Sequence, residues 1–564
     1  MSSSSERDPL LLPQPGVPRD EQPPPPPAIN NVVSRAKLVW ILVALWTTVF
    51  LGAMDGTIVA TLQQPIGDYF EQSHKASYVG TSYLLSICCF TPLYGRLSDI
   101  LGRKGAMLLA LAFFTTGTFF CAIAPSMEAL IAARAIAGMG GGGVMTVSNI
   151  TVTDLIPLRS RGLFQGFTNM SGPVLPRVVH ADDIDSLFGA GAGLGGPLGG
   201  WISDNFGWRI AFGFQVPLLV LAAILVSFHV NIVLPRAPLT INQMLAKIDW
   251  LGSLTLVVAV SSILIGFSLK ATEDLEWSDM LVWGPLALGV LGFASFGFVE
   301  AKVSPEPVLP MQLLLSRTPL AVALTNFFGS IVSFSMLYNV PLYFMAVRLQ
   351  TASQAGLHLL PNSFALSIGS VGAGWIMRHT GKYWRLVVAS TALSLFASIR
   401  VASWDQDKAS EFELWFDIAP NGLGFASMLT STLIAIIACV SRDDMAIATG
   451  ITYLFRTTGQ VLGVSLSGTL FQAILMKQLR ERMPGPDASN YLIMRNAGLV
   501  RSLKASQRQA AVDSFAIALR TVFICQAALA FIGMICALPI EERPLPGSHE
   551  EHEESHQRRQ QRSA

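Results

Sequence analysis

The 564-residue sequence is short of charged side chains: only 13% of its residues are Asp, Glu, Lys or Arg, where soluble proteins carry about 25%. Basic and acidic residues nearly cancel, 38 against 37, so the charge balance gives no indication of a nucleic-acid partner. The six cysteines all lie in apolar stretches without metal-ligand spacing. We therefore interpret them as small buried side chains rather than as disulfides or a zinc site.

Two further features are missing. No short basic and apolar secretory signal opens the chain, so the first apolar span is expected to direct its own insertion. No nucleophile–base or metal constellation stands out either. We therefore predict a protein that is not an enzyme, with no catalytic residue, cofactor or metal.

Long apolar runs fill most of the chain instead, and 51% of its residues are hydrophobic. About 20 apolar residues cross the ~30 Å hydrocarbon core of a bilayer as a helix. The sequence therefore predicts an all-α polytopic membrane protein with fourteen spans. The expected spans are 38–62, 77–95, 105–125, 129–153, 161–203 (interrupted), 209–234, 250–269, 281–299, 319–346, 355–377, 385–403, 415–440, 447–476 and 515–538.

The spans divide the chain six, two and six. We predict a six-helix bundle over 37–235, a linker with two extra helices over 236–318, and a second six-helix bundle over 319–540. Residues 1–36, which include a run of prolines, and 541–564, which are charged, are expected to be disordered tails. Two such bundles around a midplane cavity are the physical basis of alternating access.

The loops set the expected orientation. Lys and Arg collect in the loops on one side, which places both termini in the cytoplasm, whereas acid-rich loops lie on the other side. The basic stretch 477–514 falls on the acidic side, but it is long enough to be translocated despite its charge.

The loop between the second and third spans carries a specific motif. It has glycines that allow a tight turn and an acid among basic residues, in the order Gly95-Arg96-Leu97-Ser98-Asp99-Ile100-Leu101-Gly102-Arg103-Lys104. A positive loop alone is common in membrane proteins, but this ten-residue string is far more specific. It resembles the signature loop of the major facilitator superfamily, which implies a fold of two six-helix bundles plus two extra central helices.

Three other segments add to this resemblance. The surroundings of Arg134 are similar to the family's motif in span four, and the string from Asp55 to Thr61 resembles that of its fourteen-span branch. Span five ends in a glycine–proline pattern similar to the antiporter motif, formed by Gly196, Pro197, Gly199 and Gly200. These small residues also suit helix packing alone. Span thirteen contains an arginine and glycines that echo the first half, as duplicated halves would.

Asp55 and Arg134 are the expected coupling residues. A charge at membrane depth is costly and is rarely retained without an internal partner. Burial favours the protonated form of a carboxyl group, so Asp55 is expected to hold a proton until a cation or Arg134 arrives. A side chain that takes a proton or a cationic substrate, but not both, is the simplest basis for exchange. Two alternatives stay open: Arg134 reaches an interface, or the two residues form a permanent structural brace.

Other polar residues are candidates for the lining of the central cavity. They are Thr57 in span one, Asn326, Tyr338 and Asn339 in span nine, and Arg456 and Gln460 in span thirteen.

Residues 171–186 interrupt span five with polar and proline residues. Such backbone is not tolerated facing lipid. Either these residues are a retained intron in the gene model, or they are a genuine insertion that forms a loop in the cavity.

The N-terminal tail contains an acidic dileucine pattern, Glu6 with Leu10 and Leu11, which a sorting adaptor can bind. Together with the loop motif, it resembles fungal vacuolar basic amino acid transporters. The resemblance implies a monomeric proton-coupled antiporter in the vacuolar membrane, whose partners are small cationic substrates, protons, the lipid bilayer and the adaptor. The alternatives are drug or toxin efflux at the plasma membrane and a nutrient sensor that does not transport.

Overall fold

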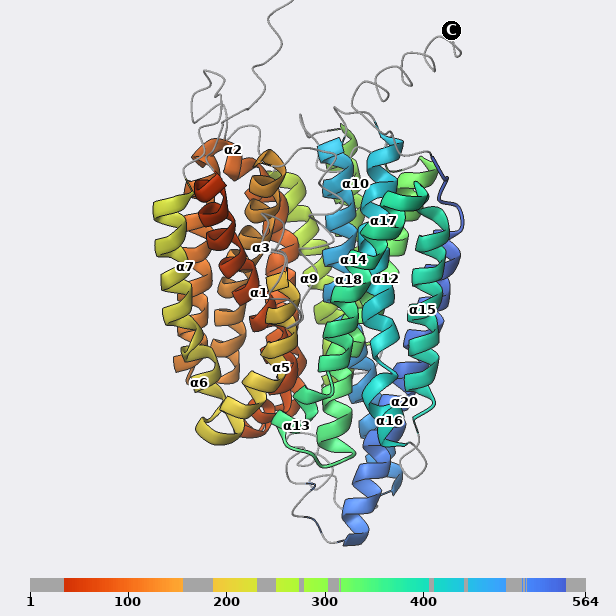
Figure 1. The fold of residues 1–564 in the computed structure, drawn as a ribbon. Coiled ribbons are helices and arrows are strands. Elements are labelled where there is room, and N and C mark those ends of the chain that lie inside the picture. Colours follow the sequence, from red (N-terminus) through yellow and green to blue (C-terminus); the bar gives the residue numbers. More distant parts are fainter. Residues whose placement is uncertain are drawn as a thin grey trace, which may run out of the picture.

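The computed structural model describes residues 35–155, 186–230, 250–272, 278–302, 314, 316–404, 410–440, 445–482, 500, 503 and 505–543. All regular elements in these ranges are helices (Figure 1). The sorting pattern of Glu6, Leu10 and Leu11 lies outside the described residues. So does the interruption of span five, apart from Ser186.

The first group of helices forms the left-hand bundle in Figure 1. It comprises α1 (Arg35–Tyr69), the short 3-10 helix η1 (Ser73–Lys75), α2 (Ala76–Ile123), α3 (Met127–Leu155), α5 (Ser186–Phe206), α6 (Trp208–Gly213) and α7 (Gln215–His229). The second group forms the right-hand bundle and comprises α12 (Arg317–Ala346), α13 (Ala352–Leu357), α14 (Leu360–Thr380), α15 (Trp384–Ala402), α16 (Glu411–Phe416), α17 (Ala419–Cys439), α18 (Met445–Arg482) and α20 (Ala505–Ala537). Two further helices, α9 (Trp250–Thr272) and α10 (Met280–Lys302), pack on each other, and α9 contacts α2 and α18.

Each predicted span overlaps a helix of the structure, and α2 covers two of them. Among the described residues, 10 helices are long and apolar enough to cross a membrane. Figure 1 shows α1 starting and α20 finishing at the same end of the molecule, as an even number of crossings requires. The all-α architecture is thus confirmed, whereas the count of fourteen crossings remains a prediction.

The signature loop does not separate two helices by a stretch of coil. Helical structure runs through α2, and the chain departs from helical geometry at Gly102, where φ is 78° and ψ is 159°. A positive φ is a conformation that glycine adopts without the steric cost a side chain would bring. The break between the second and third spans is therefore fixed at this one residue.

The interior of both bundles is apolar, as the hydropathy pattern predicts. Aromatic side chains such as Phe114, Phe212 and Phe344 are completely buried. The predicted burial of the cysteines was wrong in part: Cys525 is exposed on α20, and Cys439 and Cys536 are only partly buried, although all three lie in apolar stretches. In a membrane protein the outer surface of a helix faces lipid, so an apolar surrounding sequence does not imply burial within the protein.

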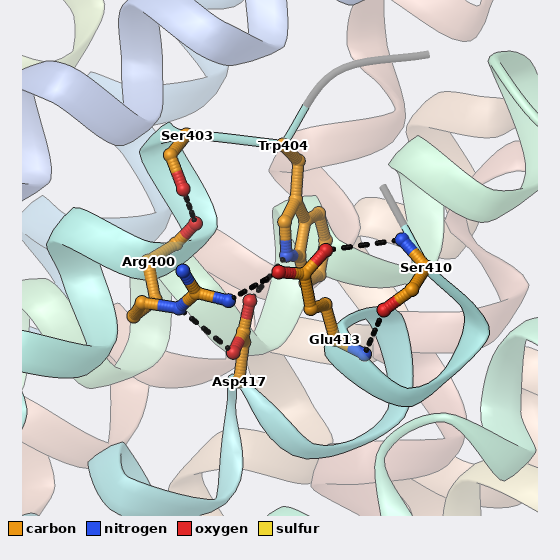
Figure 2. Close-up of polar contacts among 6 residues, drawn as sticks. All are labelled: Arg400, Ser403, Trp404, Ser410, Glu413 and Asp417. Atoms are coloured by element: carbon orange, nitrogen blue, oxygen red, sulfur yellow. Dashed lines mark hydrogen bonds and ion pairs between the residues drawn. The ribbon is translucent and has the colours of Figure 1, made fainter. Parts of the chain in front are cut away.

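A polar cluster holds the connection between α15 and α17 near α16, at the lower end of the right-hand bundle in Figure 1, and Figure 2 shows it in close-up. Arg400 donates to Glu413 at 2.7 Å and to Asp417 at 3.1 Å, and the Trp404 indole also donates to Asp417 at 3.1 Å. The side chain of Ser410 caps α16, and Glu413 reaches back to the Ser410 backbone N–H. This reciprocal capping box explains why a short helix begins at Glu411.

Candidate functional site

Asp55 and Arg134 form an ion pair inside the first bundle. Arg134 Nη1 donates to Asp55 Oδ2 at 2.7 Å, and both side chains are 0% exposed. The partners come from α1 and α3, so the contact joins two helices distant in sequence. Arg134 thus does not reach an interface in this conformation. The arrangement matches the predicted pairing and leaves open whether the pair is permanent.

The guanidinium of Arg134 is held by groups on neighbouring helices. Its Nε donates to the Val79 carbonyl oxygen at 3.3 Å, and its Cζ lies 4.1 Å from the centroid of the Tyr83 ring. Close packing of α2 and α3 makes this possible: a Cβ on Gly138 would lie 2.3 Å from the Tyr83 carbonyl oxygen. The glycine of the span-four motif therefore lets α3 approach α2 closely enough for Arg134 to reach its partners.

The pair is not fully satisfied. Asp55 Oδ1 and Arg134 Nη2 are buried and have no hydrogen-bond partner among the described residues. An unpaired polar atom in the interior costs free energy comparable to a lost hydrogen bond. The carboxylate thus keeps one free oxygen that can accept a proton or a donor group.

A cavity of about 50 Å³ lies between the two bundles. Its volume suits a few water molecules, whereas small-molecule sites usually have ~300 Å³ or more. No charged side chain lines it, and the polar groups on its wall are amides and hydroxyls. The lining residues are Gln63, Gln64, Ser73, Ala76, Ser77, Tyr338, Asn339, Leu342, Val464, Ser467, Gly468, Phe471, Gln472, Leu475 and Phe515.

Glutamines are the feature of this cavity that the sequence reasoning missed. Gln63 Nε2, Gln64 Oε1 and Gln472 Oε1 are buried without a hydrogen-bond partner among the described residues. The available signal was the presence of amide side chains inside apolar spans, which are costly unless they bind something. Their free donor and acceptor atoms make the cavity able to bind a polar solute.

Tyr338 connects the cavity with the ion pair. Its side chain lines the cavity and packs against Gly80 so closely that a Cβ there would lie 2.7 Å from the ring. The preceding residue, Val79, is the one whose carbonyl oxygen binds Arg134. A movement of Tyr338 therefore bears directly on the turn of α2 that holds the arginine.

Of the remaining predicted lining residues, Asn339 lines this cavity, whereas Thr57, Asn326, Arg456 and Gln460 do not. The hydroxyl of Thr57 donates back to Met54 of its own helix, and Asn326 donates to Thr432, which joins α12 to α17. Gln460 is buried on α18, and Arg456 is half-buried on the same helix. Asn339 shares the cavity with Tyr338 and donates to Ser467 at 2.9 Å.

The glycine–proline motif lies where α5 packs against α1 of its own bundle and α13 of the second bundle. A Cβ on Gly199 would lie 2.9 Å from Ile58 of α1, and one on Gly200 would lie 2.5 Å from the Ala352 carbonyl oxygen of α13. Thr61 donates to the Gly196 carbonyl oxygen at 3.4 Å, and Pro197 follows within the helix. The motif thus allows α5 to touch α1 on one side and the second bundle on the other.

In the signature loop, Arg103 is buried and donates to the Ser98 hydroxyl at 2.7 Å, which in turn donates to the Gly95 carbonyl oxygen at 2.7 Å. These bonds brace the helix just before and after the break at Gly102. The side chains of Arg96 and Asp99 lie outside the described part of the structure, so the predicted pairing of Asp99 stays a prediction. Lys104 continues the helix.

Comparisons with known proteins agree with this geometry. Residues 45–464 match the family model of the Major Facilitator Superfamily. The chain is 38% identical over 507 residues to "Multidrug resistance protein fnx1" of Schizosaccharomyces pombe, which covers 89% of this chain and 92% of that protein. It is 31% identical over 470 residues to "Vacuolar basic amino acid transporter 1" of Saccharomyces cerevisiae, with 78% and 79% of the two chains covered.

A solved structure shows the same fold. The crystal structure of a bacterial homologue of the human lysosomal transporter Spinster superposes with a TM-score of 0.53 at 15% sequence identity, covering 90% of this chain and 99% of the other. Paired bundles, a buried ion pair between α1 and α3, and a family match over most of the sequence lead to one assignment. The chain is an integral membrane protein of the Major Facilitator Superfamily, a family of transporters that move small molecules across membranes.

Proposed function

We propose that the protein is a proton-coupled antiporter that moves small cationic solutes from the cytoplasm into a vacuole, and that basic amino acids are its main substrates. The observation that carries the proposal is the buried pair of Asp55 and Arg134 with its free carboxylate oxygen. The similarity to a relative named as a vacuolar basic amino acid transporter supports the choice of substrate and compartment.

Exchange follows from competition at Asp55. A proton on this carboxyl group removes its charge and weakens its attraction to Arg134. In an acidic lumen Asp55 would be loaded with a proton, and on the less acidic cytoplasmic side it would release that proton and attract a cation. Each pH unit across the membrane supplies about 1.36 kcal/mol per proton, enough for about tenfold accumulation.

The cavity constrains the transport cycle. At about 50 Å³ it does not hold an amino acid in this conformation. Substrate binding therefore requires the two bundles to separate, and the amides of Gln63, Gln64 and Gln472 would then be exposed to the solute. Movement of the bundles about a central site is the alternating-access mechanism.

The test is the variant Asp55→Asn in sealed vesicles with an imposed pH gradient. We expect the variant to lose pH-driven uptake of lysine and arginine. A monodisperse elution profile of the purified variant in detergent shows that it is folded. Asp68→Asn is the matched control, because Asp68 lies near the end of the same helix, where it accepts a hydrogen bond from the Ser73 hydroxyl at 3.0 Å. Normal pH-driven uptake by Asp55→Asn would rule out the proposed role.

Drug or toxin efflux at the plasma membrane is the second candidate. It is favoured by the 38% identity to a relative named as a multidrug resistance protein. A fluorescently tagged chain with Leu10→Ala and Leu11→Ala, compared with the unaltered chain, separates the two. The vacuolar proposal expects the unaltered protein at the vacuolar membrane and the variant redirected, whereas efflux expects both at the plasma membrane.

A further inference from the structure

Arg456 is a cation at membrane depth with no carboxylate partner in the described part of the chain. It lies 11 residues into α18, or ~16 Å along the helix from its first residue. Its side chain is half-buried, and its Cζ lies 5.7 Å from the centroid of the Tyr453 ring. None of the ion pairs between described residues includes Arg456.

Arg456 lies on α18 between the face that packs on α12 and a contact with the first bundle. One and two turns later on its side of the helix, a Cβ on Gly459 or Gly463 would lie 2.4 Å or 2.6 Å from a carbonyl oxygen of α12. Tyr453, one turn earlier, accepts a hydrogen bond at 3.4 Å from Asn149 of α3. Arg456 is therefore within one turn of a contact between the two bundles.

The contrast with Arg134 indicates that Arg456 is not a structural brace. Arg134 is neutralised by Asp55 within its own bundle, whereas Arg456 forms no ion pair with any described residue. The two sites are also separate. Val79, which binds Arg134, and Cys88, which lies at the level of Thr458, are nine residues apart on α2, or ~14 Å.

An unpaired arginine in the membrane interior is costly unless a ligand supplies the opposite charge. Guanidinium binds a carboxylate through two parallel hydrogen bonds, which makes it selective for this planar anion. We propose that Arg456 binds the carboxylate of the transported solute, so that the substrate class is amino acids with a cationic side chain rather than organic cations in general. The inference rests on the proposed function. Because the side chain of lysine does not span the ~14 Å between the two levels of α2, one substrate molecule does not contact Arg456 and Asp55 together, and the two residues act at different stages of the cycle.

Pairs of solutes that differ only in the carboxylate test this inference. The full-length protein is reconstituted in sealed vesicles, and initial uptake is measured for lysine against cadaverine and for arginine against agmatine. The unaltered protein should prefer each amino acid by about tenfold to a hundredfold, the range expected for a hydrogen-bonded charged group. In Arg456→Gln the preference should fall close to one, through loss of amino acid uptake, and Arg456→Lys should retain part of it.

Arg482→Gln is the matched control, because Arg482 lies at the far end of the same helix and pairs with Asp513 at 3.3 Å. Its preference should stay unchanged. An unaltered protein that takes up amino acid and amine equally overturns the inference even if Arg456→Gln does not fold, and so does a variant that keeps the preference or loses both solutes equally. Failure of proton coupling is seen separately, in the pH-gradient measurement on Asp55→Asn.

Discussion

Removing one member of the buried pair should have different consequences for the two residues. Asp55 and Arg134 approach to 2.7 Å with both side chains 0% exposed. At this distance the Coulomb attraction is about 6 kcal/mol for an effective dielectric constant of ~20. Much of that attraction offsets the desolvation of the two charges, so the informative quantity is the cost of leaving one charge alone.

Arg134→Gln leaves Asp55 without its cation, but a carboxylate can take up a proton. For an aspartate in water this costs about 4 kcal/mol at pH 7 and about 1.5 kcal/mol at pH 5. The loss of stability of Arg134→Gln should therefore not exceed about 4 kcal/mol at pH 7 and about 1.5 kcal/mol at pH 5. The native variant then binds one proton more than the unfolded chain, so its stability relative to the unaltered protein rises as the pH falls.

Asp55→Asn leaves Arg134 alone, and a guanidinium does not lose its proton in proteins. We expect a loss of ~3–5 kcal/mol, the usual cost of a broken buried pair, at pH 7 and pH 5 alike. The double variant Asp55→Asn with Arg134→Gln removes both charges and should be less damaging than either single change.

The measurement is the thermal unfolding midpoint of the purified protein in detergent at pH 7, 6 and 5, each variant against the unaltered protein at the same pH. Recovery of Arg134→Gln on acidification, with none for Asp55→Asn, is the expected result. Equal pH dependence of the two single variants, or a double variant less stable than both, would refute the reasoning.

Two further predictions concern the packing of the bundles and the polar cluster of Figure 2. In Gly200→Ala the new methyl would lie 2.5 Å from the Ala352 carbonyl oxygen. We expect this clash to weaken the contact between α5 and α13 by about 1–3 kcal/mol and to reduce initial uptake in vesicles ~5- to 150-fold. Gly297→Ala, where nothing lies within 4 Å of the added Cβ, should leave uptake unchanged, and equal effects of both would contradict the steric argument. Asp417→Asn weakens the acceptor of Arg400, so the midpoint in detergent should fall by the equivalent of about 1 kcal/mol, an effect that 1 M salt should reduce; an unchanged midpoint would show that the cluster adds nothing to stability.

The helical architecture could be predicted from the sequence because it depends on a local property. Twenty apolar residues have to satisfy their backbone hydrogen bonds within one segment, so hydropathy alone locates the helices. Gly102 is a similar case, since a glycine between two spans predicts a break and the structure places the positive φ there. Capping residues such as Ser410 and Glu413 also carry a local signal, because a Ser followed three residues later by Glu is the pattern of a capping box.

The site could be predicted only in part, because contacts between helices depend on how the helices rotate against one another. The cost of an isolated charge predicts that Asp55 and Arg134 need partners, but not that Val79 and the Tyr83 ring complete the surroundings of the guanidinium. The glutamine cavity needs α1 and α18 to face each other, and nothing local to either helix specifies that. For the same reason Asn326 was expected in the cavity, but it hydrogen-bonds Thr432 between α12 and α17.

The glycine contacts of α5 have a mechanical consequence. Where Gly200 meets α13, a Cβ would lie 2.5 Å from the Ala352 carbonyl oxygen, so main chain packs directly on main chain there. Dispersion attraction between such surfaces falls by a quarter to a half over a gap of ~0.5–1 Å. The bond from the Ser353 backbone N–H to Asp204 at 2.9 Å is a polar link at the same junction. α5 and α13 can therefore separate at Gly196 and Gly200 without a side chain at either position having to leave a pocket.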